Sequence, residues 1–244
     1  MAGVNQTQRL ASKNMKISIV VPAYNEEGTI GPVLERLEQL DLDCEFIVVN
    51  DGSTDGTSQV LAGYAGHPRV RVEHKANGGK GTALRRGFEI AAGDIVVVQD
   101  SDLELDPAKI PDLVAPIERD EADVVYGSRF LLPVPGLKVK RRLANWLLTF
   151  LTNRVYGCRI TDMETAHKAF RRDFLGRLNL EATRFDIEVE LTAKLARCGA
   201  RMIEIPSRYQ PRTVDQGKKI QFRDGVHAIK MILRWSRWKP STAS

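Results

Sequence analysis

The sequence predicts an α/β fold in which a mostly parallel central sheet is covered by helices on both faces. Short apolar runs alternate along the chain with segments whose apolar residues repeat at helical spacing. These runs are apolar throughout rather than alternating, as expected for strands buried between two helical layers. Polar clusters directly follow three of them. In a sheet of this kind, ligands bind at that edge, outside the carboxyl ends of the strands.

The first two strands are predicted on either side of a helix. Residues 17–22, ISIVVP, form an apolar run that ends at a proline, and residues 27–40 carry apolar side chains at helical spacing. A second strand is predicted at 45–50, EFIVVN. Thr54 or Asp55 is expected to cap the helix that follows it.

The pattern continues with the short strand 70–72, the helix 81–92 and the wholly apolar strand 94–99. Residues 123–127, DVVYG, add one more strand. The polar clusters at the expected ligand edge are Ala23 to Glu26, Asn50 to Ser53, and the acids from Asp100 onward.

The chain has 244 residues, of which 43% are apolar, enough for a sizeable core. We expect a flexible tail at 1–14, a single α/β domain at 15–225 and an amphipathic basic helix with its tail at 226–244. No apolar run reaches the roughly 18 residues that span a bilayer, and the polar N-terminus lacks the apolar stretch of a signal peptide. A cytoplasmic location is therefore expected. Cys44, Cys158 and Cys198 show no paired spacing and are expected to be reduced thiols.

Charge is distributed unevenly along the chain. Residues 1–120 carry 12 basic and 19 acidic residues, residues 121–200 carry 14 and 9, and residues 201–244 carry 10 and 3. The first part is suited to a metal ion and the rest to anions, although charged surfaces of this kind are often simply solvated. The basic residues do not resemble a nucleic-acid reading helix, so nucleic acid is not expected as a partner.

The stretch VQDSDLELDP follows the strand at 94–99 and concentrates four carboxylates. Carboxylates at the end of a buried strand repel one another unless a cation neutralises them. Asp100 and Asp102 are two residues apart, so on an extended chain they point to the same side, and Glu104 continues that phase. Their oxygens favour Mg²⁺ or Mn²⁺. Asp106, before Pro107, is expected only to cap the next helix.

The basic part of the chain contains two amphipathic segments. Four cations between 138 and 142 precede an apolar helix at 143–156, an arrangement that suits a phosphate head with a hydrocarbon tail, although a buried core helix fits this segment equally well. In the C-terminal helix, Phe222, Val226, Ile229 and Leu233 form a stripe that can pack on the domain. Met231, Trp235 and Trp238 lie roughly opposite among cations, which predicts contact with an anionic membrane surface or, alternatively, a homodimer contact.

Taken together, the motifs are highly specific. IVVPAYNEE, VVNDGSTDGT, NGGKGTALRRGFEIAAGD, VVVQDSDLELDP and VVYGSRF occur in the order and at the spacing of family 2 glycosyltransferases, which have the GT-A fold. TDMETAHKAFRR, RFDIEVELTAKLARCG and YQPRTVDQGKKIQFRDG extend the resemblance over roughly residues 15–235. The chain looks most similar to the dolichyl-phosphate and polyprenyl-phosphate sugar transferases.

This resemblance implies a role for each matching residue on the donor side. Pro22, Ala23, Tyr24, Asn25 and Glu26 would line the nucleoside pocket, with Asp51 at the base. Lys80 would approach the donor, Asp100 would lie near the ribose and the metal, and Asp102 would be the principal metal ligand. Glu104 stands where related enzymes often carry another oxygen ligand. Arg212 and Lys218 look like a loop that closes over the diphosphate.

The acceptor side follows from the same pattern and from the chemistry of phosphate. Ser128, Arg129, Arg141 and Arg142 are expected to hold the acceptor phosphate, which is largely dianionic at neutral pH and attacks without a strong base. Direct displacement would invert the anomeric centre. Asp162 is the candidate base if the acceptor is a hydroxyl group, which must lose a proton.

Three functions remain open from the sequence. The chain is expected to be a transferase that moves a sugar from GDP-mannose or a UDP-hexose to a polyprenyl or dolichyl phosphate, bound peripherally at the inner face of a membrane. The alternatives are a family 2 transferase acting on a soluble hydroxyl acceptor and a non-catalytic nucleotide-sugar binder. The intact acids and the basic loop argue against the last.

Overall fold

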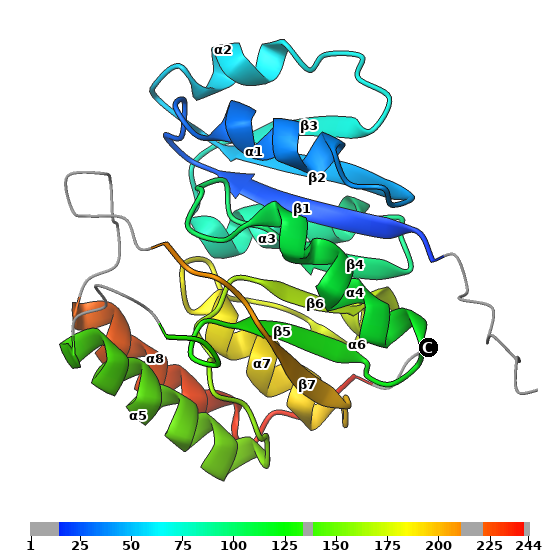
Figure 1. Ribbon diagram of the computed structural model, residues 1–244. Coiled ribbons are helices and arrows are strands. Elements are labelled where there is room, and N and C mark those ends of the chain that lie inside the picture. Colours follow the sequence, from blue (N-terminus) through cyan, green and yellow to red (C-terminus); the bar gives the residue numbers. More distant parts are fainter. Residues whose placement is uncertain (1–14, 134–138, 211–221, 242–244) are drawn as a thin grey trace, which may run out of the picture.

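The computed structural model describes residues 15–133, 139–210 and 222–241, apart from the side chains of Arg141 and residues 222–226. Its centre is a sheet whose seven described strands lie in the order β3-β2-β1-β4-β6-β5-β7 (Figure 1). The strands are β1 (Ile17–Ala23), β2 (Cys44–Asp51), β3 (Val70–Lys75), β4 (Ile95–Val98), β5 (Val124–Ser128), β6 (Lys168–Arg171) and β7 (Met202–Pro206).

The five strands expected from the sequence are all present, with ends that differ by a few residues. Strand β1 pairs in parallel with both β2 and β4, and β2 pairs in parallel with β3, so these four strands end at one edge. Strands β6 and β7 were not expected. Strand β7 is parallel to β5, whereas β6 runs antiparallel to both of its neighbours. The sheet is therefore mostly parallel, as predicted, with one reversed strand inside it.

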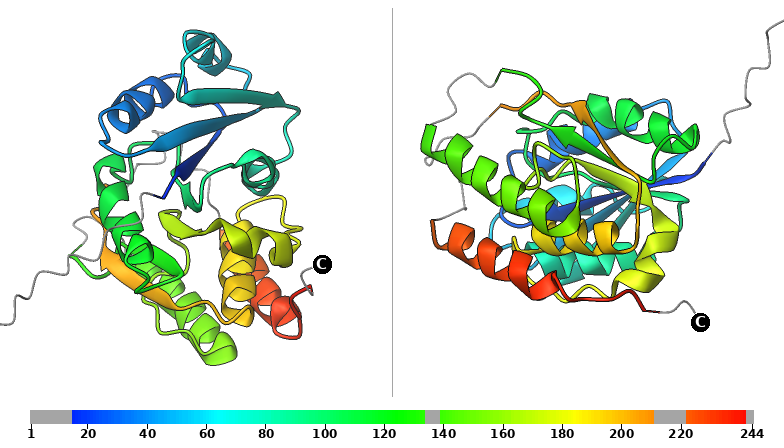
Figure 2. Two further views of the ribbon diagram at one scale, coloured as in Figure 1. Left: turned by 90° about the vertical axis from the view of Figure 1, so that its right-hand side faces the viewer. Right: turned by 90° about the horizontal axis from the view of Figure 1, so that it is seen from below.

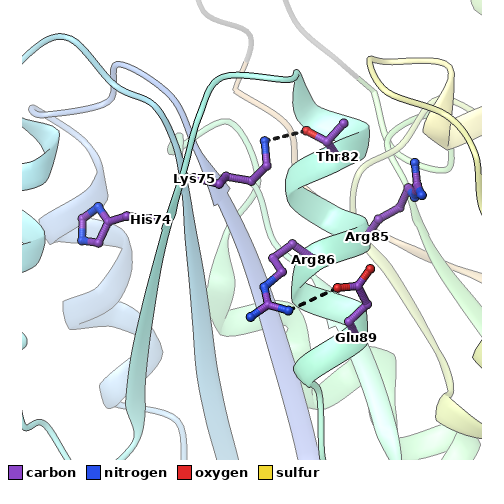
Figure 3. A pocket seen from close by; sticks show the side chains of 6 residues that line it. All are labelled: His74, Lys75, Thr82, Arg85, Arg86 and Glu89. Carbon is purple, nitrogen blue, oxygen red and sulfur yellow. Dashed lines mark hydrogen bonds and ion pairs between the residues drawn. The ribbon is translucent and has the colours of Figure 1, made fainter.

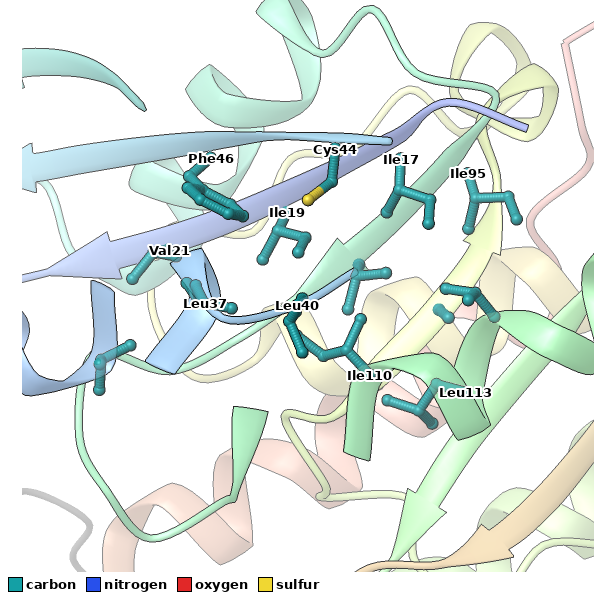
Figure 4. Packing of buried hydrophobic residues seen from close by; sticks show 14 of the residues in the cluster. Ile17, Ile19, Val21, Leu37, Leu40, Cys44, Phe46, Ile95, Ile110 and Leu113 are labelled. Carbon is teal, nitrogen blue, oxygen red and sulfur yellow. The ribbon is translucent and has the colours of Figure 1, made fainter. Parts of the chain in front are cut away.

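Helices cover both faces of this sheet (Figure 2). One face packs against α1 (Ile30–Glu38), α2 (Thr57–Ala62) and α4 (Ile110–Glu118), where alternate strand residues such as Ile17 and Ile19 meet Leu37 and Ile110 (Figure 4). The other face packs against α3 (Lys80–Ile90), α5 (Val139–Tyr156), α7 (Ile187–Arg197) and α8 (Phe222–Trp235). Burial on both faces explains why β1, β2 and β4 are almost wholly apolar, whereas β3, at the edge of the sheet, carries charged residues.

Three short helical turns complete the chain: η1 (Pro107–Lys109), η2 (Arg172–Phe174) and α6 (Leu175–Leu178). Asp106 begins η1, and its carboxylate accepts a hydrogen bond from the backbone N–H of Ala108 at 3.1 Å. The capping role expected for Asp106 is thus confirmed. The N-cap of α2 is Gly56 rather than Thr54 or Asp55, although Asp55 Oδ1 accepts a hydrogen bond from the backbone N–H of Thr57 at 3.0 Å.

Helix α8 lies beside α5 and α7 in Figures 1 and 2, but its inward face is not the one expected. Trp235 is buried, together with Ala228 and Ile232, while Leu233 of the expected packing stripe is 61% exposed. The rings of Trp235 and Trp238 lie 4.1 and 5.0 Å from Lys194 Nζ. Because Lys194 is itself buried in an ion pair with Glu190, Trp235 is part of the domain interior and is not available to a membrane.

Candidate active site

The carboxylate of Asp100, just beyond β4, is paired with a lysine. Lys80, the first residue of α3, places its Nζ 2.7 Å from Asp100 and 3.0 Å from Glu188 of α7. Burial favours a neutral amine, but the two neighbouring carboxylates outweigh it and hold the pKa of Lys80 above its ordinary value. Lys80 is therefore a permanent cation at the edge where β4 ends.

Glu188 extends these ion pairs into the interior of the domain. Its Oε2 pairs with Nζ of Lys168, the first residue of β6, and Lys168 also donates to the carbonyl of Met163 at 3.1 Å. Burial alone would raise the pKa of Glu188, but Lys168 and Lys80 lower it below its ordinary value. Sequence reasoning did not find Glu188 and Lys168, although the charged residues within the apolar segments FDIEVEL and HKAF were a usable signal.

The two other predicted metal ligands follow Asp100 in a tight turn. Asp102 accepts a hydrogen bond from the backbone N–H of Glu104 at 3.1 Å, and Glu104 Oε2 accepts one from the hydroxyl of Tyr209, also at 3.1 Å. Within the described residues, no three His, Cys, Asp or Glu side chains are grouped closely enough to hold a metal ion. One or two carboxylates do fit Mg²⁺, which is commonly shared between the protein and substrate phosphates.

The predicted nucleoside pocket lies where β1 and β2 end. Asn25 has a left-handed backbone with φ of 54°, and its Oδ1 accepts a hydrogen bond from the N–H of Thr54 at 2.8 Å. The backbone N–H of Glu26 donates to Thr57 Oγ1 at 2.8 Å. These bonds join the two strand exits into one wall. Pro22 and Ala23 are buried in that wall, and Tyr24 is partly exposed.

Asp51 fixes the loop that leads into α3. Its carboxylate accepts hydrogen bonds from the backbone N–H groups of Gly78 and Gly79 at 3.0 and 2.7 Å, and it pairs with Lys75. Gly79 has a φ of 92° and lies so close to the carbonyl of Thr183 that a side chain would clash. Asp51 therefore sets the position of Lys80, which directly follows Gly79.

Arg129 and Asp162 form the clearest pair on the opposite side of the site. Nε and Nη2 of Arg129 lie 2.7 and 2.8 Å from the two oxygens of Asp162, which also accepts the backbone N–H of Arg129. Burial disfavours a charged Arg129, yet the attraction of Asp162 keeps its pKa above the ordinary value. Asp162 is fully buried. Ser128, also buried, bonds Thr161 Oγ1 at 2.6 Å.

The segment that carries Asp162 is held from two sides. Glu204 of β7 accepts the backbone N–H groups of Thr161 and Asp162 at 2.7 and 3.0 Å. From α5, Thr149 Oγ1 accepts the N–H of Met163 at 3.2 Å, and Asn153 Nδ2 donates to the carbonyl of Ile160 at 2.7 Å. Helix α5 is thus bonded directly to the wall of the site.

The outer side of α5 is apolar. Leu143, Trp146, Leu147 and Phe150 are between 42% and 61% exposed, and we call these four residues the α5 apolar face. Trp146 and Phe150 stack with their ring centres 5.6 Å apart. Among the described residues, the large apolar side chains that are most exposed lie between 131 and 150 or at Leu233 of the adjacent α8. Lys140 and Arg142 are exposed at the start of the same helix.

Glu164 lies between the two groups of charges, in the segment that leads from Asp162 to β6. Its Oε1 is buried and has no hydrogen-bond partner among the described residues. Burial, and then the negative charge of Glu188, raise the pKa of Glu164 to about 7, against the opposing effect of Lys168 and Arg129. Sequence reasoning missed this residue as well.

Four predicted residues remain: Arg141, Arg142, Arg212 and Lys218. Arg212 and Lys218 lie outside the described residues, and so does the side chain of Arg141. Arg142 is exposed on the first turn of α5. Their predicted roles therefore stay predictions.

A polar hollow lies between β3 and α3 (Figure 3), lined by His74, Lys75, Thr82, Arg85, Arg86 and Glu89. Lys75 donates to Thr82 Oγ1 at 2.9 Å, and Arg86 pairs with Glu89 at 3.2 Å and with Glu73 at 3.0 Å. These charges are satisfied within the protein. The strand ends, rather than this hollow, therefore define the candidate site.

Fold and site together define an enzyme class. Carboxylates after β4, a largely buried lysine beside them and a wall built from the exits of β1 and β2 lie at the edge where a sheet of this kind binds its ligand. This arrangement is that of a GT-A glycosyltransferase.

The comparisons give the family. The sequence model of the protein family Glycosyl transferase family 2 matches residues 18–178, and the chain belongs to that family. The protein is therefore a glycosyltransferase.

Two relatives act on lipid phosphates according to their names. An undecaprenyl-phosphate mannosyltransferase of Micrococcus luteus is 29% identical over 243 residues, which cover 92% of this chain and 97% of that protein. A dodecaprenyl-phosphate galacturonate synthase of Rhizobium johnstonii is 31% identical over 175 residues, which cover 69% of this chain. The match spans only 51% of the Rhizobium protein's length.

A solved structure confirms the fold. Glucosyl-3-phosphoglycerate synthase of Mycobacterium tuberculosis, in complex with Mn²⁺, UDP and phosphoglyceric acid, superposes with a TM-score of 0.70 at 26% identity. The superposition covers 93% of this chain and 80% of that one. A further structure of the same synthase contains Mg²⁺ and UDP.

Proposed function

We propose that this glycosyltransferase moves a sugar from a nucleoside diphosphate sugar to the phosphate of a polyprenyl phosphate at a membrane surface. One observation carries the proposal: helix α5 contacts the candidate site on one side and exposes apolar side chains on the other. Its inner side is bonded to the segment of Asp162 through Thr149 and Asn153, and its outer side is the α5 apolar face. A lipid resting on that face would bring its phosphate toward the site wall.

The donor would bind along the edge formed by β1, β2 and β4. Residues 22–26 and Asp51 would surround the nucleoside, and Lys80 would lie near the diphosphate because it is a permanent cation at that edge. Asp102, assisted by Asp100, would hold Mg²⁺ or Mn²⁺. When bound, such an ion would offset the charge of the departing nucleoside diphosphate. Mn²⁺ and UDP occur together in a complex of the Mycobacterium synthase, which supports this arrangement.

The acceptor phosphate would lie near Arg129. Nε and Nη2 of Arg129 are engaged by Asp162, and no described residue accepts a hydrogen bond from Nη1. Asp162 therefore holds the guanidinium in place, and Nη1 would remain for the acceptor phosphate. Ser128, bonded to Thr161, would support the same segment. Arg141 and Arg142 at the start of α5 would add charge at the lipid headgroup.

Attack by a dianionic phosphate needs no strong base, and direct displacement would invert the anomeric carbon. The alternative, a hydroxyl acceptor with Asp162 as base, is less well supported. Both oxygens of Asp162 are engaged by Arg129, and the carboxylate is fully buried. We therefore assign Asp162 a positioning role.

Reversible attachment to the inner face of a membrane would follow from the same helix. None of the described helices is long and apolar enough to cross a bilayer. The α5 apolar face would enter the headgroup region, and Lys140 and Arg142 would be drawn to the anionic lipids of the cytoplasmic leaflet.

The decisive experiment offers the purified protein a set of radiolabelled nucleotide sugars, including GDP-mannose and several UDP-hexoses, with undecaprenyl phosphate in detergent and Mg²⁺ or Mn²⁺. We expect labelled product in the organic phase with one donor, and none with an Asp102→Asn variant. Product found only in the aqueous phase, with a soluble hydroxyl acceptor supplied in parallel, would replace the proposal with that alternative.

A further inference from the structure

The start of β6 lies at the same edge of the sheet as the ends of β4 and β5, because β6 runs antiparallel to both. Lys168 pairs in register with Val98 of β4 and with Tyr126 of β5. The residues just before Lys168 therefore enter the acceptor side of the site from a part of the chain that follows β5 by more than thirty residues. Glu164 is one of these residues.

The described cations around Glu164 are already paired with other carboxylates. Lys80 is paired with Asp100 and Glu188, Lys168 with Glu188, and Arg129 with Asp162. The charged groups that act on Glu164 are Asp162 on its own segment, Arg129 after β5, Lys168 of β6 and Glu188 of α7. Three cations face three carboxylates, so an ionised Glu164 would be a fourth negative charge with no described cation of its own.

The position of its oxygens supports the same conclusion. Oε1 is buried and makes no hydrogen bond with the described residues, while the residue as a whole is partly exposed. Burial and the charge of Glu188 raise the pKa of Glu164 to about 7. A neutral carboxylic acid offers an O–H donor, and a buried donor without an acceptor has a free-energy cost that a bound anion would remove.

We propose that Glu164 binds the phosphate monoester of the acceptor by sharing one proton with it. The proton lies between a carboxyl oxygen of Glu164 and a phosphate oxygen, in an O–H···O bond that is charge-assisted and short. This inference rests on the proposed function, since it requires a phosphate acceptor. It adds a residue that selects phosphate: an acceptor without an anionic oxygen would leave the acid unpartnered.

The binding experiment uses two probes of equal chain length, geranyl phosphate and geranyl sulfate. The sulfate stays a monoanion across the pH range, so any change in its affinity with pH comes from the protein. Titration calorimetry at pH 6, 7, 8 and 9 is run on the wild type, Glu164→Gln and Glu164→Ala. Glu35→Gln, on the exposed side of α1, is the matched control.

Above pH 7, the wild type should lose affinity for geranyl sulfate, approaching about tenfold per pH unit as the proton is removed from Glu164. Glu164→Gln donates an N–H at every pH and should bind with an affinity that varies by less than about threefold over the series. Glu164→Ala should bind both probes weakly, and Glu35→Gln should follow the wild type. A wild-type slope that survives in Glu164→Gln would overturn the inference.

Separate arms test the source of the phosphate and the basis of the inference. Glycerol 3-phosphate replaces geranyl phosphate to distinguish a soluble phosphate monoester from a lipid one, and Glu164 should affect both in the same way. Donor titration and thermal unfolding of each variant show that the fold is intact. If the wild type binds the donor but neither phosphate, the proposed acceptor class fails and the role of Glu164 fails with it. If the wild type binds both phosphates and Glu164→Ala binds them with the same affinity as the wild type, only the role of Glu164 fails.

Discussion

Arg129 and Asp162 meet through two hydrogen bonds of 2.7 and 2.8 Å, at a carboxylate that is fully buried. Arg129 follows β5, and Asp162 belongs to a segment 33 residues later that is held by α5 and β7. Their contact therefore fixes this side of the candidate site, which we propose receives the acceptor, to the sheet.

Asp162→Asn should be markedly destabilising because it leaves a largely buried guanidinium without its counter-charge. Breaking a buried pair on one side costs about 3–5 kcal/mol of unfolding free energy, and urea denaturation measures this directly. Asp112→Asn, which breaks an exposed pair with Lys109, is the control and should cost less than about 1 kcal/mol. Equal losses in the two variants would mean that the Arg129 pair has no special structural role.

Activity should depend on Mg²⁺ or Mn²⁺ and on Asp102. An excess of chelator should abolish turnover, and Asp102→Asn should lower kcat/KM by at least about a hundredfold while the unfolding curve is preserved, since a charge-stabilising ligand is lost. Asp106→Asn, four residues along, alters a helix cap and an exposed 4.0 Å pair with Arg36, and should cost about 1 kcal/mol or less of stability. Full turnover in chelator would contradict the metal assignment.

The α5 apolar face should bind vesicles. Changing Trp146 and Phe150 together to Ser should reduce sedimentation with anionic liposomes by about tenfold or more, because each exposed ring contributes about 1.5–3 kcal/mol when it is buried in lipid. The double change to Leu, which keeps both positions apolar, should largely retain binding. Unchanged sedimentation of the Ser variant would move the membrane contact elsewhere on the protein.

His167 should make the fold sensitive to acid. It is fully buried, its Nδ1 lies 3.3 Å from Ser207 Oγ, and burial lowers its pKa to about 4. The unfolded chain takes up a proton near pH 6.5, whereas the folded protein does so only near pH 4. As the pH is lowered from 6.5 to 4, the unfolded chain binds the proton more readily than the folded protein does. The unfolding free energy should therefore decrease by up to about 1.4 kcal/mol for each pH unit of acidification.

His167→Gln has no group that titrates in this interval, so its unfolding free energy should depend less steeply on pH than that of the wild type. Urea denaturation of both proteins at pH 4.5, 5.5 and 6.5 makes the comparison. Parallel curves would show that His167 takes up its proton equally well in the folded state.

Much of the sheet is predictable because β1, β2 and β4 are buried on both faces. Residues such as Val20, Val48 and Val97 form apolar runs that have no other explanation in a chain of this composition. Strand β6 is different: it has four residues, and two of them, Lys168 and Arg171, are charged. It is held in the sheet by its ladders with β4 and β5, and its buried Lys168 is neutralised by Glu188, twenty residues away. No local pattern contains these contacts.

The difference between local and long-range contacts also explains which residues of the candidate site could be predicted from the sequence. The acids after β4 and the residues at the exits of β1 and β2 could be found because they follow recognisable strands. Glu164 could not, since its chemistry depends on which neighbours are already paired. For α8, helical spacing correctly gave two faces, but the choice of inward face was wrong. The buried pair of Lys194 and Glu190 stabilises the ring of Trp235 beside it, and that contact lies in the tertiary structure.

The reversal of β6 has a consequence for how the enzyme can change. The proposed nucleotide edge is built from residues 22–102, and the proposed acceptor wall is built from residues 129–188. The two portions are joined by the ladder between β4 and β6 and, at the site itself, by the pair of Lys80 and Glu188. Replacing the second portion leaves the first with its own hydrogen bonds, such as those of Asp51. If the proposed function holds, changes in the second portion that preserve the β4–β6 pairing and an acid opposite Lys80 are expected to alter the acceptor while the sugar donor stays the same.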